Sequence, residues 1–153
     1  MISKLKTIRV SILAGLALLS SCVSGPHFYM QYGNEYREIE LDKLLAENPL
    51  APGENIKVVN LGRSASASQH VVQIRDREIP HVHNLHDVTV TMMGGQGDLI
   101  LDKNRINLKA GDVAHIPRGA VHYFVNTDRK PSVVMAVYAP AYDGKDTQPV
   151  KQP

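Results

Sequence analysis

The sequence has no tryptophan, and aromatic residues make up only 5% of the chain. It also lacks an apolar stretch much longer than Val10–Leu19. A helix over that stretch would reach only about 15 Å, half of the hydrocarbon core of a bilayer, so no permanent membrane span is predicted. With 11 Gly and 9 Pro in 153 residues, the scarcity of aromatics favours a turn-rich architecture of short strands over a helical bundle.

An excess of charge of one sign is absent as well. The formal net charge is +2, but Lys4, Lys6 and Arg9 all fall in the first ten residues. Without these three, 14 Lys and Arg face 15 Asp and Glu, a net charge of −1. The chain therefore shows none of the basic surplus that nucleic-acid-binding proteins carry, and nucleic acid is excluded as a partner.

The first 21 residues have the pattern of a signal peptide, because a basic segment precedes the apolar stretch Val10–Leu19. Leu19-Ser20-Ser21-Cys22 resembles a bacterial lipobox, in which the cysteine is lipidated and becomes the mature N-terminus. Cys22 is the only cysteine, and an ordinary secretory signal with a coincidental cysteine is the alternative. The resemblance implies several acyl chains, palmitate among them, and stable membrane anchoring through Cys22. Because Val23 rather than Asp follows, it also implies the outer membrane, facing the periplasm, as the location in the cell envelope.

After the leader, the length suits one globular domain. Residues 22–36 show no clean period, so we expect a lipid-anchored tether there and the domain in residues 37–153. A short helix is predicted over Lys43–Glu47, with Asp42 as its cap and Asn48-Pro49 as its end. The tail from Asp143 to Pro153 has few apolar residues and is expected to lie along the domain or to fray.

Seven short apolar runs separated by turn residues follow the Pro52-Gly53 turn. They are Ile56–Leu61, His70–Ile74, Val88–Met93, Leu99–Leu101, Val113–Ile116, Val121–Val125 and Val133–Ala139. Runs of this length at roughly regular spacing predict an all-β domain with a closed or sandwiched antiparallel sheet.

Three of the seven histidines lie within six residues, in His81-Val82-His83-Asn84-Leu85-His86. On a strand, residues two apart face the same side with their Cα atoms about 6.6 Å apart. His81 and His83 can therefore direct two imidazoles at one ion, at metal–nitrogen distances of about 2.1 Å.

A second segment, Gly111–Asn126, resembles the second motif of the cupin family. The residues that match are Gly111, Pro117, Gly119, His122 and Asn126. The histidine segment resembles the first cupin motif through His81, His83, Asp87 and Gly94. The resemblance covers roughly residues 56–139 and implies a cupin double-stranded β-helix, a jelly-roll β-barrel with a short N-terminal helix.

By the same resemblance, His122 joins His81, His83 and Asp87 around one divalent transition metal. The family usually has Glu where this chain has Asp87, and an aspartate is one methylene shorter. His86, next in the chain, could replace that carboxylate and complete a four-histidine site. Otherwise His86 would lie at the mouth of the pocket and contact the ligand residues without binding the metal itself.

Three histidines and a carboxylate suit Fe, Mn, Ni, Cu or Zn and leave positions open for a small ligand. We therefore expect a metal-binding cupin lipoprotein that acts as an oxygenase or isomerase on a small oxygenated molecule. The alternative is a non-catalytic envelope protein that binds metal or a small ligand, since fold alone does not decide function. Homodimers through the outer strands are common in the family.

Overall fold

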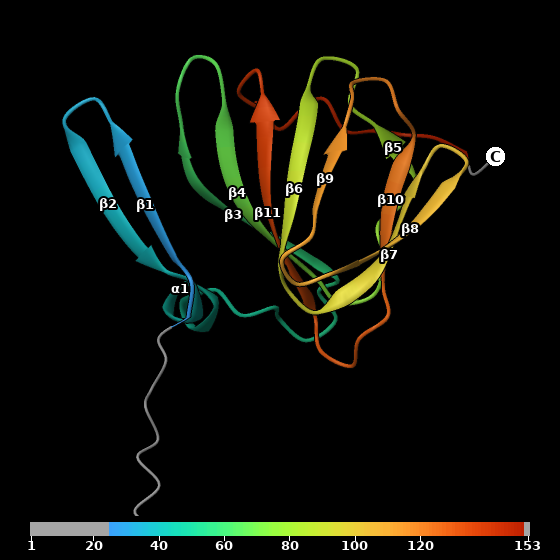
Figure 1. The fold of residues 1–153 in the computed structure, drawn as a ribbon, viewed down its shortest axis with the longest axis horizontal. Coiled ribbons are helices and arrows are strands. Elements are labelled where there is room, and N and C mark those ends of the chain that lie inside the picture. Colours follow the sequence, from blue (N-terminus) through green and yellow to red (C-terminus); the bar gives the residue numbers. More distant parts are fainter. Residues whose placement is uncertain (1–24, 152–153) are drawn as a thin grey trace, which may run out of the picture.

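The structure is a computed structural model that describes residues 25–151, and these form a β-barrel with a hairpin and a short helix at one side (Figure 1). Within that range no helix is long and apolar enough to cross a membrane. The predicted signal peptide and Cys22 lie outside the described residues.

Twelve strands and one helix make up this part of the chain. In order they are β1 His27–Tyr32, β2 Glu35–Glu40, α1 Leu41–Glu47, β3 Ile56–Arg63, β4 Ser68–Ile74, β5 His81–Val82, β6 Asp87–Gly94, β7 Gln96–Leu101, β8 Asn104–Lys109, β9 Val113–Ile116, β10 His122–Asn126, β11 Ser132–Ala139 and β12 Gln148–Pro149. Each of the seven predicted runs coincides with one of these strands.

The barrel consists of two five-stranded antiparallel sheets that face one another. One sheet has the order β3-β4-β11-β6-β9 and the other the order β12-β5-β10-β7-β8. Consecutive strands alternate between the sheets at several points, as in a jelly roll (Figure 1). The predicted all-β fold, a double-stranded β-helix with a short helix before it, is confirmed.

Both faces of the first sheet carry apolar side chains. Successive residues of a strand point to opposite faces, so each strand contributes to both. Val72 and Val134 point into the barrel and belong to its main core. Their neighbours Val71 and Val133 point outward and pack with Phe28 of β1 and other side chains of the hairpin and helix. Burying one such side chain stabilises the fold by about 1.5–3 kcal/mol, so the hairpin protects a face that would otherwise be exposed apolar surface.

The hairpin of β1 and β2 differs from the tether that the sequence predicted for residues 22–36. Phe28, Met30 and Tyr32 alternate with more exposed residues along β1, and Phe28 is buried against the first sheet. The alternation has only three more-buried residues and includes large polar side chains, which hides it in the sequence. Part of the expected tether is therefore folded onto the domain.

The helix α1 begins two residues earlier than predicted, at Leu41. Glu40 occupies the capping position without a side-chain hydrogen bond, and Asp42 lies in the first turn instead of capping it. A carboxylate there still interacts favourably with the helix dipole. At the other end Asn48 is the C-cap, and its side-chain amide donates to the carbonyl of Leu44.

The second sheet positions the histidine segment. The two-residue strand β5 is held between β10 and β12, with His122 opposite His81 and Gln148 opposite Val82. The C-terminal tail thus lies along the barrel, which is one of the two outcomes expected for it. Because β12 pairs with β5, the tail forms the edge of this sheet beside the histidine segment.

Candidate metal centre

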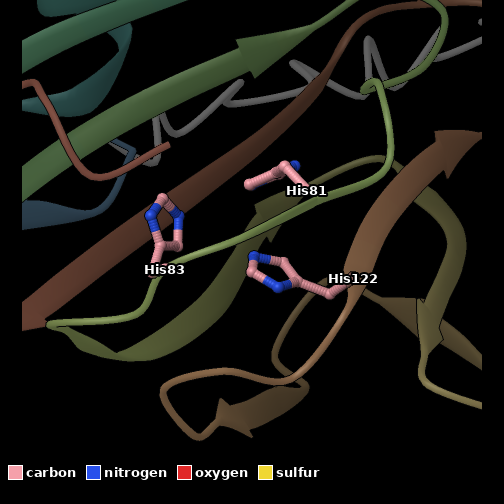
Figure 2. Close-up of side chains that lie close together, drawn as sticks. All are labelled: His81, His83 and His122. Atoms are coloured by element: carbon pink, nitrogen blue, oxygen red, sulfur yellow. The ribbon is translucent and has the colours of Figure 1, made fainter. Parts of the chain in front are cut away.

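His81, His83 and His122 come together at one point of the barrel. Their ring centroids lie 4.3 Å apart for His81 and His122, 5.0 Å for His81 and His83, and 5.3 Å for His83 and His122. All three residues are buried, and one ring nitrogen of each lies within 4.8 Å of the others. Figure 2 shows the three side chains close together, two from one segment and the third from β10.

Each of the three rings uses its Nδ1 for a hydrogen bond to a main-chain carbonyl. These bonds join His81 to Ile79 at 2.8 Å, His83 to Asp146 at 2.9 Å, and His122 to Ala120 at 3.0 Å. A carbonyl oxygen can only accept, so Nδ1 carries the proton in all three rings and Nε2 carries the lone pair. This is the arrangement in which metal-ligating histidines are usually held.

Burial also favours the neutral form of two of these rings, those of His83 and His122. Burial lowers the pKa of His122 to about 4, with smaller contributions from its neighbours His81 and His83. Burial likewise lowers the pKa of His83, and the hydrogen bond to Asp146 only partly offsets this. Rings that stay unprotonated at neutral pH can bind a metal without first losing a proton.

The donor set fits a divalent transition metal. Neutral imidazoles suit Fe, Ni, Cu and Zn, and the metal–nitrogen distance is about 2.1 Å for zinc. Ligands around such an ion lie about 3–3.5 Å apart, so nitrogens within 4.8 Å of one another need only small ring rotations. The three histidines could therefore hold one divalent metal, whose identity the donor set leaves open.

Asp87, the fourth predicted ligand, does not lie in this group. Its Oδ1 accepts from the main-chain N–H of Arg118 at 2.9 Å and from Nε at 3.2 Å, while Oδ2 accepts from Nη2 at 2.8 Å. These hydrogen bonds hold the pKa of Asp87 well below its usual range. The structure thus brings together three of the four predicted ligands and directs the carboxylate to an arginine.

His86, the predicted alternative ligand, is buried beside the group but has a different partner. Its Nδ1 lies 2.7 Å from Oδ2 of Asp146. The same carboxylate accepts from the main-chain N–H groups of Asn84 at 3.1 Å and Leu85 at 2.8 Å. Asp146 therefore fastens the C-terminal tail to the loop that carries the histidines.

A groove of about 700 Å³ opens beside the cluster, and His81 and His83 are part of its wall. Tyr138 and Tyr142 stack on each other along it, with ring centroids 4.6 Å apart. The ring of Tyr138 lies 5.3 Å from that of His83. A second, much smaller cavity of about 50 Å³ lies in the apolar interior, bordered by His81 and His122.

Glu78 was not singled out in the sequence, yet it borders both the groove and the interior cavity. Its Oε2 accepts from the main-chain N–H of Phe124 at 2.9 Å. Burial raises the pKa of Glu78, although His81 nearby opposes this. Glu78, Tyr138 and Asp146 belong to no motif of the sequence, so no local signal marked them.

Fold and site together define a class: small double-stranded β-helix proteins whose barrel carries a histidine cluster able to hold a divalent metal. Comparisons with known proteins agree. Residues 70–138 match the family model of the cupin domain, Cupin_2. A protein of Aquifex aeolicus, described as uncharacterized, is 45% identical over 94 residues, which cover 61% of this chain and 77% of that protein. The chain therefore resembles the cupin family over residues 70–138, and its barrel has the double-stranded β-helix fold.

Two solved structures show the same fold. A Klebsiella pneumoniae protein with a double-stranded β-helix domain matches with a TM-score of 0.60 and 20% identity, over 71% of this chain and 95% of that one. Pac13 of Streptomyces, described as a nucleoside dehydratase, matches with a TM-score of 0.54 and 22% identity, over 63% of this chain and 79% of that one. At these identities the likeness concerns the fold.

Proposed function

We propose that the protein is a metal-dependent enzyme that acts on a small oxygen-containing molecule in the groove beside His81 and His83. The observation that carries the proposal is the set of three rings whose Nδ1 atoms all bond to main-chain carbonyls, which leaves their Nε2 atoms free to bind a metal. A metal held by only these three residues keeps further coordination positions for a ligand.

The bound metal would polarise a carbonyl or hydroxyl oxygen of the ligand, and iron would add the activation of O₂. The chain supplies polar groups beyond the histidines, as an enzyme requires. Glu78 is a carboxyl whose raised pKa lets it keep a proton closer to neutral pH. Burial also raises the pKa of Tyr138, which keeps its hydroxyl protonated and able to donate a hydrogen bond in the groove.

A second candidate function is binding without turnover, in which the protein sequesters metal or a small ligand. The apolar part of the groove, which includes Ile56, Val58 and Ile79, favours this alternative because a binding pocket is mostly apolar. The likeness to Pac13, which is described as a nucleoside dehydratase, supports the catalytic candidate only in showing that this barrel can host an enzyme.

The experiment is metal analysis of the full-length chain, purified in mild detergent, beside His83→Ala, His122→Ala and His115→Ala. His115 is an exposed histidine of β9 and serves as the matched control. We expect one metal per chain in the wild type and the control, and loss of metal from the other two. Equal metal content in all four proteins would contradict the site.

Turnover is tested next on the metal-loaded protein. Oxygen uptake and substrate loss are measured against a panel of small diols and diketones. The enzyme is supported if the wild type and His115→Ala consume a substrate and His122→Ala does not. Binding of panel compounds without their consumption supports the sequestering alternative.

We propose further that Cys22 is lipidated and anchors the domain to the outer membrane, facing the periplasm. The support is the sequence of the leader, with Leu19-Ser20-Ser21 before the cysteine. In cells grown with labelled palmitate, the wild-type protein should carry the label and fractionate with membranes. Cys22→Ser should carry no label, and its labelling to the wild-type level would contradict the anchor.

A further inference from the structure

A β-bulge in β3 turns Arg63 toward the groove. Asn60 pairs with His70 of β4, but the next pairs are Gly62 with Gln69 and Arg63 with Ser68, so β3 has one residue more than β4. In a regular strand, residues 60 and 63 would point to opposite faces. The extra residue puts Arg63 on the same face as Asn60, and both belong to the wall of the groove.

The hairpin holds this bulge in place. Gly62 has no room for a side chain, since a Cβ there would lie 2.3 Å from Cε2 of Tyr32 in β1. The hydroxyl of Tyr32 also donates to the side chain of Gln69, the residue opposite the bulge. Leu61, beside Gly62, is buried in the core between sheet and hairpin. Packing around Leu61 and Gly62 therefore fixes the side of the strand on which Arg63 lies.

The guanidinium of Arg63 is free to meet a ligand. The residue is exposed, and within residues 25–151 it forms no salt bridge. Asp143 also borders the groove, but its Oδ1 accepts from the main-chain N–H of Lys145. Arg63 thus places on the groove wall a positive charge that has no salt-bridge partner among the described residues.

His70 borders the same groove as Arg63, His81 and His83. Its ring is 5.4 Å from that of Tyr138, which in turn lies 5.3 Å from His83. The Nε2 of His70 lies 2.9 Å from Oγ of Ser68, while its Nδ1 is buried and has no partner among the described residues. Burial lowers the pKa of His70, and the positive charge of Arg63 lowers it further. A buried ring nitrogen without a partner costs stability unless a ligand satisfies it.

We propose that Arg63 and His70 form a carboxylate-binding subsite, and that the molecule bound in the groove is a small organic acid. This rests on the proposed function: the acid carries metal-binding oxygens at the histidine end and its carboxylate at Arg63. A planar carboxylate matches the fork of a guanidinium. A dianionic phosphate fits less well, because the carboxylate of Asp143 borders the same groove.

Three probes distinguish binding at the histidine end of the groove from binding at Arg63. Catechol offers two adjacent metal-binding oxygens, 3,4-dihydroxybenzoate adds a carboxylate to them, and benzoate offers the carboxylate alone. Binding to the zinc-loaded, full-length protein in detergent is measured by calorimetry, with zinc binding measured first. The variants are Arg63→Gln and, as the matched control, Arg129→Gln in the exposed connection between β10 and β11.

For the wild type and Arg129→Gln we expect 3,4-dihydroxybenzoate to bind at least tenfold more tightly than catechol. In Arg63→Gln the difference should fall below threefold, with zinc affinity and thermal unfolding unchanged. Equal affinity for the two probes in the wild type, or a preference that survives Arg63→Gln, overturns the subsite. If neither zinc nor another divalent transition metal binds, the proposed function fails, and Arg63-dependent binding of benzoate still decides the subsite.

Discussion

Both carboxylate oxygens of Asp87 bond to Arg118, with 2.8 Å between Oδ2 and Nη2 and 3.2 Å between Oδ1 and Nε. The pair connects the first residue of β6 to the turn between β9 and β10, the turn that leads to His122. Bidentate pairs of this kind fix geometry as well as charge. The structure thus directs both carboxylate oxygens of Asp87 to Arg118 and not to the three histidines.

Asp87→Asn should therefore leave the metal content of the protein unchanged, whereas His122→Ala should remove the metal. We expect only a small fall in the unfolding midpoint, because the pair is largely exposed and surface ion pairs contribute little. Zinc titration and elemental analysis measure the outcome. A loss of metal from Asp87→Asn comparable to that from His122→Ala would make Asp87 a ligand after all.

Asp146→Asn should weaken metal binding about tenfold, although Asp146 is not itself in the cluster. Its carboxylate holds the loop of Asn84, Leu85 and His86, and its carbonyl accepts from His83. An amide in place of the carboxylate leaves at least one buried donor unpaired, at a cost of about 1–3 kcal/mol.

Asp143→Asn is the matched control for that change, since Asp143 lies on the same tail but is exposed. Metal affinity is measured by competition with a chelator, and stability by urea unfolding of the metal-free protein. Unchanged zinc affinity in Asp146→Asn would show that the tail has no part in positioning His83.

The metal-free protein should lose stability as the pH falls from about 6.5 to 4. His122 has a pKa of about 4 in the folded state and a usual value of 6.5, so the unfolded chain binds more protons in this window. The contribution of His122 to the free energy of unfolding is fully present above pH 6.5. It decreases by up to about 3 kcal/mol as the pH falls through 4.

Urea unfolding at pH 7, 5.5 and 4.5 measures this dependence, with His122→Gln as the variant that lacks the titrating ring. Its stability should change less with pH than that of the wild type. Parallel pH curves for the two proteins would contradict the neutral, buried state of His122.

Gly62→Ala should destabilise the fold by about 1–3 kcal/mol, because the added methyl group meets the ring of Tyr32. It should also reduce the preference for 3,4-dihydroxybenzoate over catechol, since the bulge that directs Arg63 must shift. Gly94→Ala is the control, because a Cβ at Gly94 meets no atom within 4 Å. Retained probe preference in a destabilised Gly62→Ala would show that the bulge does not direct Arg63.

The barrel could be predicted because its strands carry their own signal. Val133–Ala139 and His70–Ile74 are apolar on both faces, and turn residues separate the runs. Strand β8 could not be predicted from the sequence, because most of its residues are polar, as in Asn104, Arg105 and Lys109. Leu108 is the one buried residue of this strand. Strands β5 and β12 have two residues each, too few to show any period, and exist only through pairing with neighbours.

The sequence by itself determined the all-β fold through its short apolar runs, and the alternation along a strand placed His81 and His83 on one side. That His122 joins them followed from the resemblance to the two cupin motifs. The tertiary structure alone decided the partners of the polar groups. Asp87 meets Arg118, and Asp146 reaches His86, across separations of 31 and 60 residues. Such pairings depend on which segments the two sheets bring together, and local spacing carries no information about contacts between distant segments.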